Sequence, residues 1–502
     1  MTTAQQLVHA YETGLGLAPS GDADVPDPDA RLAATLPVWA LAAGSVAAAS
    51  AAADRVRAAQ GLSTRPARLD ADRVTAAFSS ERLFRRDGSA PSVFAEFSGF
   101  FRTADGWVRT HANYPHHRER ILRALELPID SDAAQLSARL SAMKGAEVED
   151  AAAAVGAIAA RVRAEDEWAN SPMGRAAAVG PLVAMHVRED RRPATAASDD
   201  HRSTTGTAFA AGHGPDRLGA SEFVAGREQD RAQVSEPGRG LGARLGTSSA
   251  PTTDRPLTGI RVLDLTRVLA GPVATRTLAL LGADVLRIDP PQLPEIDWQF
   301  ADTCQGKRST LLDLRTDLAT FEDLLAAADV LVTGYRPGAL AAAGVHGGPG
   351  LVEASVSAWG TSGPWGDRRG FDSIVQAASG ISLLEGTPEH PGALPAQALD
   401  HGSGYLLAAG VMDALLARAD DGFGRTVRVS LARTASWLLA ADGRSPDHPV
   451  ATPPDPTSTV THGESVTAAP AFADYDDYRW PAPPYGSAQP FWVEAPDHYH
   501  PA

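Results

Sequence analysis

Asp372 is the residue whose type and surroundings best fit catalysis. It follows Gly370 and Phe371 and precedes a run of small residues that predicts the start of a helix. A free aspartate has a pKa of about 3.9, so it is ionised at neutral pH and can act as an oxygen nucleophile without a neighbouring base. The same position is also typical of a helix N-cap, in which the carboxylate accepts backbone N–H groups. These residues alone leave both interpretations open.

Several basic residues follow predicted strands or lie in the adjacent loops, where a nucleotide-like ligand binds in an open parallel sheet. Guanidinium and ammonium groups are suited to phosphate, and an acidic chain must supply such cations locally. Each of them alone could equally be a solvated surface charge. As a set on one rim they predict a phosphate site: Arg267, Arg287, Lys307, Arg308 and Arg336.

Histidine and cysteine give no metal site. The spacing of His111, His116 and His117 fits no standard zinc pattern, so we interpret them as a polar surface loop or a contact between domains. The single cysteine, Cys304, excludes an internal disulfide and a multi-cysteine site, and we interpret it as a passive buried thiol. His401 is a further candidate for the mouth of a site around Asp372.

The elements that must position these residues alternate between strand and helix after residue 255. Short runs of β-branched residues and leucine predict strands at 260–265, 284–289, 309–313, 329–333, 351–357 and 425–430. Helical stretches separate several of them, at 273–281, 318–328 and 400–416. Strand, helix and strand in this order form βαβ units, so we predict an α/β fold with a Rossmann-like, doubly wound parallel sheet.

Composition limits the possible classes of function. The chain has 502 residues and a net charge of −16, which argues against a nucleic-acid partner. Hydrophobic residues make up 44% and aromatic residues only 6%, which favours helices packed on a sheet. The uncharged run 33–53 is alanine-rich and contains Pro37 and Gly44, so we predict a buried helix and no membrane span. Residues 1–10 have no signal-peptide pattern, and we expect a cytoplasmic protein.

The chain is expected to have several parts. Residues 187–254 are rich in Gly, Ser, Thr, Pro, Asp and Arg and lack apolar periodicity, which predicts a flexible linker. It divides an N-terminal part, 1–186, from a sheet domain, 255–440. A proline-rich tail, 441–502, is expected to pack on the surface.

Taken together, the motifs of residues 256–439 resemble family III CoA-transferases, the CaiB/BaiF type. The resemblance rests on the order of these motifs: Pro256 to Thr266, Ala270-Gly271-Pro272, Leu281 to Val285, Gly306-Lys307-Arg308-Ser309, Arg336-Pro337-Gly338, Gly363-Pro364 and Gly370-Phe371-Asp372. The N-terminal part is similar to the later portion of this family. Residues 97–108 look like a strand pair of its smaller α+β domain, and residues 147–168 look like the helices that follow.

The resemblance implies an activity and a mechanism. Asp372 would attack an acyl-CoA thioester to give a mixed anhydride, which CoA converts to an aspartyl-CoA thioester before a carboxylic acid takes the CoA. Arg267, Ala270, Arg287, Lys307, Arg308 and Arg336 would bind the CoA. CoA and acyl-CoA would be substrates, with no permanent cofactor and no metal. A small organic acid would be the other partner, and the protein would be a homodimer, interlocked as in ordinary members or not.

The sequence departs from the family in ways that keep two alternatives open. Cys304-Gln305 stands where the family usually has Asn-Arg. Related racemases carry a His beside the Asp, whereas this chain has Phe371, which disfavours an acyl-CoA racemase or isomerase. The two halves are in reversed order, with a weak internal similarity between residues 39–69 and 405–429 that indicates a partial duplication. A catalytically degenerate CoA-binding scaffold is therefore the second alternative.

Overall fold

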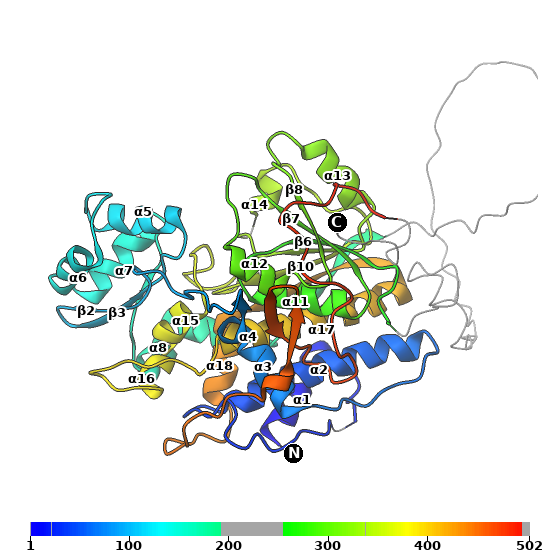
Figure 1. The fold of residues 1–502 in the computed structure, drawn as a ribbon, viewed down its shortest axis with the longest axis horizontal. Coiled ribbons are helices and arrows are strands. Elements are labelled where there is room, and N and C mark those ends of the chain that lie inside the picture. The colour runs from blue at the N-terminus through cyan, green and yellow to red at the C-terminus, as the bar shows by residue number, and fades with distance from the viewer. Residues whose placement is uncertain (1, 22, 192–254, 337, 494–502) are drawn as a thin grey trace, which may run out of the picture.

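The computed structural model describes residues 2–21, 23–191, 255–336 and 338–493, and its centre is a seven-stranded sheet (Figure 1). The strand order is β5-β11-β10-β9-β6-β7-β8. Six strands run parallel, namely β6 (Arg261–Leu265), β7 (Asp284–Asp289), β8 (Arg308–Leu311), β9 (Val330–Thr333), β10 (Val352–Ser357) and β11 (Phe423–Ser430). The edge strand β5 (Ala184–Arg191) is antiparallel to β11. The predicted α/β fold is confirmed.

This order gives the sheet a switch point. From β6 the chain moves outward to β7 and β8, then returns to pair β9 with the other side of β6. The two helix-connected halves therefore diverge between β6 and β9, where Leu265 is the register partner of Thr333. In doubly wound sheets the loops after such a pair of strands leave a crevice that binds ligands.

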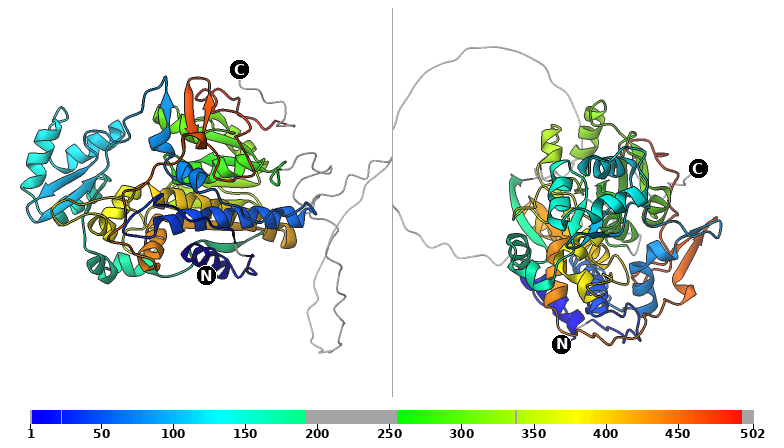
Figure 2. Two further views of the ribbon diagram at one scale, coloured as in Figure 1. Left: turned by 60° about the horizontal axis from the view of Figure 1, so that its bottom comes forward. Right: turned by 90° about the vertical axis from the view of Figure 1, so that its left-hand side faces the viewer.

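One face of the sheet is covered by alanine-rich helices in layers. Helices α11 (Ala270–Leu280) and α17 (Ala398–Asp421) lie on the sheet, and the N-terminal helices α2 (Val38–Ala59) and α1 (Thr3–Leu15) cover α17 (Figure 2). Small residues permit this close packing, since a Cβ at Gly404 would lie 2.6 Å from the carbonyl oxygen of Ala270. The predicted helix within 33–53 is thus α2, and it is buried. No helix in the described part of the chain combines the length and apolar character needed to span a bilayer.

The other face is covered only in part. Helix α13 (Leu318–Ala326) places Phe321, Leu324 and Leu325 on the side chains of β6, β7 and β9. The short helices α12 (Asp297–Thr303) and α14 (Ala339–Ala342) lie near the carboxyl ends of the strands. Over β10, β11 and β5 this face carries polar side chains and lines a pocket.

A separate α+β unit, here called the small lobe, comprises residues 97–161 and lies to the left of the sheet in Figure 1. Its antiparallel strands are β2 (Phe100–Thr103), β3 (Gly106–Thr110) and β4 (Ala159–Arg161). Helices α5 (Pro115–Ala124), α6 (Ala133–Ser141) and α7 (Gly145–Ala154) pack on them. The lobe contacts helix α15 (Asp372–Ser379), next to which the N–H of Arg163 donates to the carbonyl of Ala377 at 3.1 Å.

The tail, residues 441–502, is not confined to the surface. This differs from the expectation that it packs only there. Phe472 and Tyr478 are buried in the main core, because they fill space beside α11 and α2 that the sheet domain leaves open. A third sheet joins β1 (Arg85–Arg86) to β13 (Ser465–Ala468) and β12 (Thr459–His462). The remaining elements are α3 (Ala71–Phe78), α4 (Ser80–Leu83), α8 (Glu165–Asn170), α9 (Pro172–Ala178), α16 (Ile381–Leu384), α18 (Leu431–Ala440) and the short η1 (Pro456–Ser458).

The N-terminal part does not form an independent body. Strand β5 extends to Arg191, past the expected boundary at 187, and completes the sheet. The rest of the predicted linker, 192–254, lies outside the described residues, as do 494–502 of the tail. Helices α2 and α17, which carry the weak internal similarity, pack directly against each other. The duplication itself stays a prediction.

Candidate active site

Asp372 is the first residue of α15 and is fully buried. Phe371 is the N-cap residue, so the Asp372 side chain does not cap its own helix. The amide of Gln376 donates to its Oδ1, and the N–H of Asp400 donates to its Oδ2 at 2.9 Å. Both carboxylate oxygens are therefore held in place. The glycine before it permits a close turn, because a Cβ at Gly370 would lie 2.7 Å from the Cβ of Ala358.

Burial shapes the protonation of this carboxylate. Burial raises the pKa of Asp372 to about 6. The pKa of the neighbouring Asp400 is raised well above its ordinary value, first by burial and then by the charges of Asp372 and Glu81. No described cation forms an ion pair with Asp372 or Asp400. Above about pH 6 the Asp372 carboxylate is therefore ionised.

The small lobe covers Asp372 through its histidines. The ring of His111 stacks on Phe371 at 3.9 Å between centroids, and His117 meets the same ring edge-on at 5.8 Å. Burial lowers the pKa of His111 to about 3 and that of His117 to about 2, so both imidazoles are neutral. Of the two interpretations of this histidine segment, the contact between domains is the one observed. In the described residues no group of histidine, cysteine or carboxylate side chains could hold a metal ion.

Two of the predicted basic residues meet at the switch point. Arg267 follows β6 and Arg336 follows β9. Arg267 donates to the carbonyl of Pro294 at 2.7 Å and to Glu295 at 3.5 Å, and its Cζ lies 5.0 Å from the ring centroid of Tyr114. Arg336 is exposed, and its side chain has no hydrogen bond or ion pair to any described residue. Ala270, also predicted, begins α11 beside them and is buried.

The loop between β6 and α11 is strained. Val268 has a φ of 69°, which is unfavourable for a β-branched residue, and its N–H donates to Glu295 Oε2 at 3.0 Å. The chain can then turn into α11 only with glycine at 271, since a Cβ there would lie 2.3 Å from the Cβ of Thr266. Backbone strain of this kind concentrates at ligand-binding loops.

Two further arginines, which the sequence reasoning missed, form a positive group with Arg267 and Arg336. Burial and then the like charges of Arg120 and Arg336 lower the pKa of Arg369. Burial and the charges of Arg120, Arg267 and Arg369 lower the pKa of His116. We call Arg120, Arg267, Arg336 and Arg369 the arginine cluster. The position of Arg369, directly before the Gly370-Phe371-Asp372 motif, was a usable signal, whereas Arg120 had none because it comes from the small lobe.

The other three predicted cations are not on this rim. Arg287, Lys307 and Arg308 are almost completely buried. Arg287 pairs with Asp289 at 2.7 Å and Glu295 at 3.0 Å, Lys307 with Asp264 at 3.0 Å, and Arg308 with Asp284 at 2.9 Å. Their charges are already engaged by carboxylates, so these residues hold the sheet and its loops together.

Two minor predictions have clear outcomes. Cys304 is buried and unpaired, with its Sγ 3.4 Å from Arg287 Nη1, as expected for a passive thiol. His401 does not line an open mouth, because it is fully buried and lies 3.3 Å from Glu81 through its Nε2.

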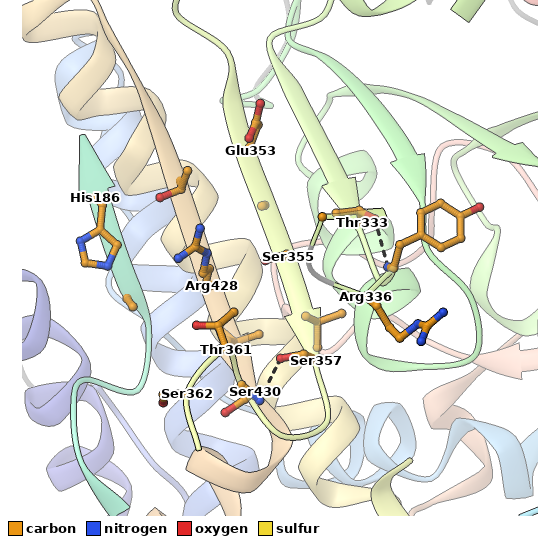
Figure 3. Close-up of a pocket in the computed structure, with 18 of the residues that line it drawn as sticks. His186, Thr333, Arg336, Glu353, Ser355, Ser357, Thr361, Ser362, Arg428 and Ser430 are labelled. Atoms are coloured by element: carbon orange, nitrogen blue, oxygen red, sulfur yellow. Dashed lines mark hydrogen bonds between the residues drawn. The ribbon is translucent and has the colours of Figure 1, made fainter. Parts of the chain in front are cut away.

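A pocket of about 530 Å³ opens on the uncovered half of the sheet (Figure 3). Hydroxyl groups line it from the carboxyl ends of β9, β10 and β11, including Thr333, Ser357 and Ser430. Arg336 and Arg428 lie at its wall, and the side chain of Arg428 too has no hydrogen bond or ion pair to a described residue. Trp359 joins the pocket to the loop before Asp372, since its Nε1 donates to the carbonyl of Arg369 at 3.2 Å. The two arginines and the hydroxyl groups are suited to binding an anion.

Comparisons with known proteins find similarity to CoA-transferases over part of the chain. Residues 257–478 match the family described as CoA-transferase family III. The chain is 35% identical over 214 residues to the probable fatty acyl-CoA transferase Rv3272 of Mycobacterium tuberculosis, which covers 38% of this chain and 54% of that protein. It is 31% identical over 221 residues to succinyl-CoA:glutarate CoA-transferase of Mus musculus, covering 39% and 51%. It is 32% identical over 210 residues to acetyl-CoA:oxalate CoA-transferase of Acetobacter aceti, covering 37% and 53%.

Two crystal structures are also similar to part of the chain. The structure of Rv3272 from M. tuberculosis matches with a TM-score of 0.35 and 35% identity, covering 37% of this chain and 56% of that one. A CAIB/BAIF family protein from Brucella suis matches with a TM-score of 0.34 and 29% identity, covering 38% and 56%. The chain spans about half the length of most of these curated relatives.

Proposed function

We propose that the protein moves CoA from an acyl-CoA thioester to a carboxylic acid, with Asp372 as the nucleophile; the match of residues 257–478 to CoA-transferase family III supports the reaction class. The observation that carries this proposal is the position of Asp372: a buried carboxylate, fixed by two donated hydrogen bonds, three residues after Arg369 of the arginine cluster. Relatives named as CoA-transferases of succinate, glutarate and oxalate support the reaction class.

The proposed reaction passes through covalent intermediates on Asp372. Its carboxylate attacks the thioester carbonyl and expels CoA as a thiolate, which leaves a mixed anhydride. The thiolate then attacks the Asp372 carbonyl, forms an aspartyl-CoA thioester and releases the first acid. The incoming carboxylate attacks this thioester and again expels the thiolate, which attacks the acyl carbonyl of the second anhydride. The new acyl-CoA leaves and the Asp372 carboxylate is restored.

The arginine cluster and the pocket are the proposed binding site for CoA. CoA is polyanionic, and a chain with a net charge of −16 must meet it with local cations. We assign its phosphates to Arg336 and Arg428 at the pocket and to Arg267 and Arg369 nearer to Asp372. Since Asp372 is fully buried, the proposal requires Phe371 and His111 to separate when the thioester arrives.

Trapping of the intermediate tests the proposal. The protein is incubated with an acyl-CoA and then with hydroxylamine, and the mass of the peptide that contains residue 372 is measured. We expect a hydroxamate on Asp372 in the wild-type protein and in Asp367→Ala, an exposed carboxylate of the same loop, but not in Asp372→Ala. An unmodified Asp372 in the wild-type protein would favour a degenerate CoA-binding scaffold, which its full burial also suits.

One observation favours a second candidate, an acyl-CoA racemase or isomerase. His111 brings a neutral imidazole against Phe371, where its buried Nδ1 has no hydrogen-bond partner among the described residues. A pKa of about 3 makes it a weak base, however, which is why we rank acyl transfer first. Exchange of deuterium from solvent into the α-carbon of an acyl-CoA, without CoA transfer, would instead support the racemase.

A further inference from the structure

Tyr114 of the small lobe is a buried hydrogen-bond donor that reaches the sheet domain. It is the N-cap residue of α5, and its hydroxyl donates to Oε1 of Glu295, which lies between β7 and α12. Burial raises the pKa of Tyr114 well above its ordinary value, so the hydroxyl keeps its proton. A hydrogen bond from a hydroxyl to a carboxylate is among the stronger ones in proteins. Two segments 181 positions apart in the sequence are joined by it.

Glu295 connects this contact to the loop between β6 and α11. Its Oε2 accepts from the N–H of Val268 at 3.0 Å and from Nη2 of Arg287 at 3.0 Å. Its Oε1, which Tyr114 contacts, also lies 3.5 Å from Nη2 of Arg267. Burial acts to raise the pKa of Glu295, but the charges of Arg287 and Arg267 lower it to about 2, so the acceptor is a carboxylate. One buried side chain therefore holds a backbone amide and two guanidinium groups.

The backbone of Val268 depends on this carboxylate. A φ of 69° is unfavourable for a β-branched residue, and strained backbone persists only where the surrounding structure holds it. The carboxylate of Glu295 is the partner that the described residues provide for the Val268 N–H. Because Tyr114 fixes the other oxygen of the same carboxylate, it restricts rotation of that group and so holds the amide contact in place.

Tyr114 and Glu295 also fix one side of the Arg267 guanidinium. The Cζ of Arg267 lies 5.0 Å from the ring centroid of Tyr114, and its Nη2 donates to the carbonyl of Pro294 at 2.7 Å. Its Nε is buried without a hydrogen-bond partner among the described residues. A guanidinium that is already held in one orientation loses less conformational entropy when it binds an anion.

We infer that Tyr114 is a positioning residue of the CoA site, which through Glu295 fixes the Val268 backbone and the Arg267 guanidinium in the geometry that binds CoA. The inference rests on the proposed function for the identity of the ligand. It gives the N-terminal part of the chain a role in binding, because the hydroxyl comes from the small lobe and the loop belongs to the sheet domain.

Tyr11 offers a matched control. Its hydroxyl is also buried and donates to a buried carboxylate, that of Asp413, at 2.5 Å, and this carboxylate also pairs with an arginine, Arg55, at 2.8 Å. Asp413 lies roughly 13 Å further along α17 than Gly404, the residue that packs on Ala270 at the start of α11. Loss of the Tyr11 hydroxyl removes the same kind of contact without touching the loop after β6.

Hydrogen exchange in the protein without ligand tests the positioning step. The amide of Val268 is followed by mass spectrometry of overlapping peptides from the full chain. We expect it to exchange about 10-fold faster in Tyr114→Phe, because a hydrogen bond to a charged group is lost and the loop opens more often. In Tyr11→Phe the exchange should not change. Thermal melts establish that both variants are folded. An unchanged rate in Tyr114→Phe, or an equal acceleration in Tyr11→Phe, would overturn the inference.

Calorimetric titration with CoA tests the consequence for binding. Tyr114→Phe should weaken CoA binding by roughly 5- to 20-fold, and Tyr11→Phe by less than about twofold. The loss caused by Tyr114→Phe should shrink in an Arg267→Ala background, because part of the group that it positions is then missing, and should stay complete in an Arg428→Ala background. Equal losses in the two backgrounds would contradict the inference, and so would an unchanged affinity in Tyr114→Phe.

Hydroxylamine trapping separates this inference from the proposed function. If Tyr114→Phe accelerates Val268 exchange and weakens CoA binding, but Asp372 of the wild-type protein is never modified, the transferase proposal falls and the positioning role stays. If Asp372 is trapped and Tyr114→Phe changes neither exchange nor affinity, the positioning role falls and the transferase proposal stays. A wild-type protein that binds no CoA would overturn both.

Discussion

The cations of the β7–β8 edge and those of the arginine cluster have the same residue types but opposite surroundings. Arg287, Lys307 and Arg308 lie in the protein interior, each with a carboxylate within 3.0 Å. In the arginine cluster only Arg267 contacts a carboxylate of the described residues, Glu295, which belongs mainly to Arg287. The charges of the first set are paired within the fold, whereas we propose that those of the second set bind a ligand. Whether the charge of a basic residue is already paired with a carboxylate, more than its presence, distinguishes a binding site from a structural pair.

The largest expected effect breaks the buried set. Arg287→Ala leaves Asp289 and Glu295 without their main cation in the interior, which should lower the free energy of unfolding by about 3–5 kcal/mol. Urea denaturation followed by circular dichroism measures this loss. Arg336→Ala, which removes an exposed member of the arginine cluster, should change the free energy of unfolding by less than about 0.5 kcal/mol. Similar losses in both variants would show that the two sets do not differ.

Asp372 extends the comparison to an anion buried without a cation. Its pKa is about 6 in the folded protein against 3.8 as an ordinary aspartate, so the folded state binds the proton more tightly. The stabilisation is complete below pH 3.8 and is lost as the pH rises through 6. Relative to Asp372→Asn, the wild-type protein should therefore lose on the order of 1–3 kcal/mol between pH 4 and pH 8.

Denaturation curves at several pH values measure this difference. Asp367→Asn, an exposed position in the same loop, should follow the wild-type profile. A wild-type profile parallel to that of Asp372→Asn would mean that residue 372 does not change protonation in this range.

Substitutions in the arginine cluster should show their effect in ligand binding. Arg336→Ala and Arg369→Ala should each weaken CoA binding by roughly 10-fold, because each removes a charge-assisted contact with phosphate. The loss should shrink at high salt, which screens exposed charges. Calorimetry with CoA at two salt concentrations measures it, and Arg315→Ala, which removes an exposed pair with Asp313, serves as the control. A loss in the control as large as in the variants would point to net charge alone.

The comparison also explains what the sequence could and could not predict. Runs of β-branched residues identified every parallel strand of the sheet, and the Gly370-Phe371-Asp372 motif identified the candidate nucleophile, because both signals are local. Whether Arg287 faces a ligand or Asp289 depends on the strand face, although the spacing of these two residues by two positions was a signal for a pair on one face. Arg120 was missed because it comes near Arg369 only through the packing of a distant segment.

The smallest expected effect tests whether Arg336 of the arginine cluster binds CoA through its charge or through the geometry of its guanidinium. Arg336→Lys keeps the positive charge at the switch point but replaces a planar fork with a point charge. If attraction of the CoA phosphates dominates, CoA affinity should fall by no more than about threefold, well short of the loss in Arg336→Ala. A lysine variant that binds CoA as weakly as the alanine variant would instead show that Arg336 forms a bidentate contact. Arg336 would then resemble the buried arginines, whose guanidinium groups contact carboxylates in a fixed geometry.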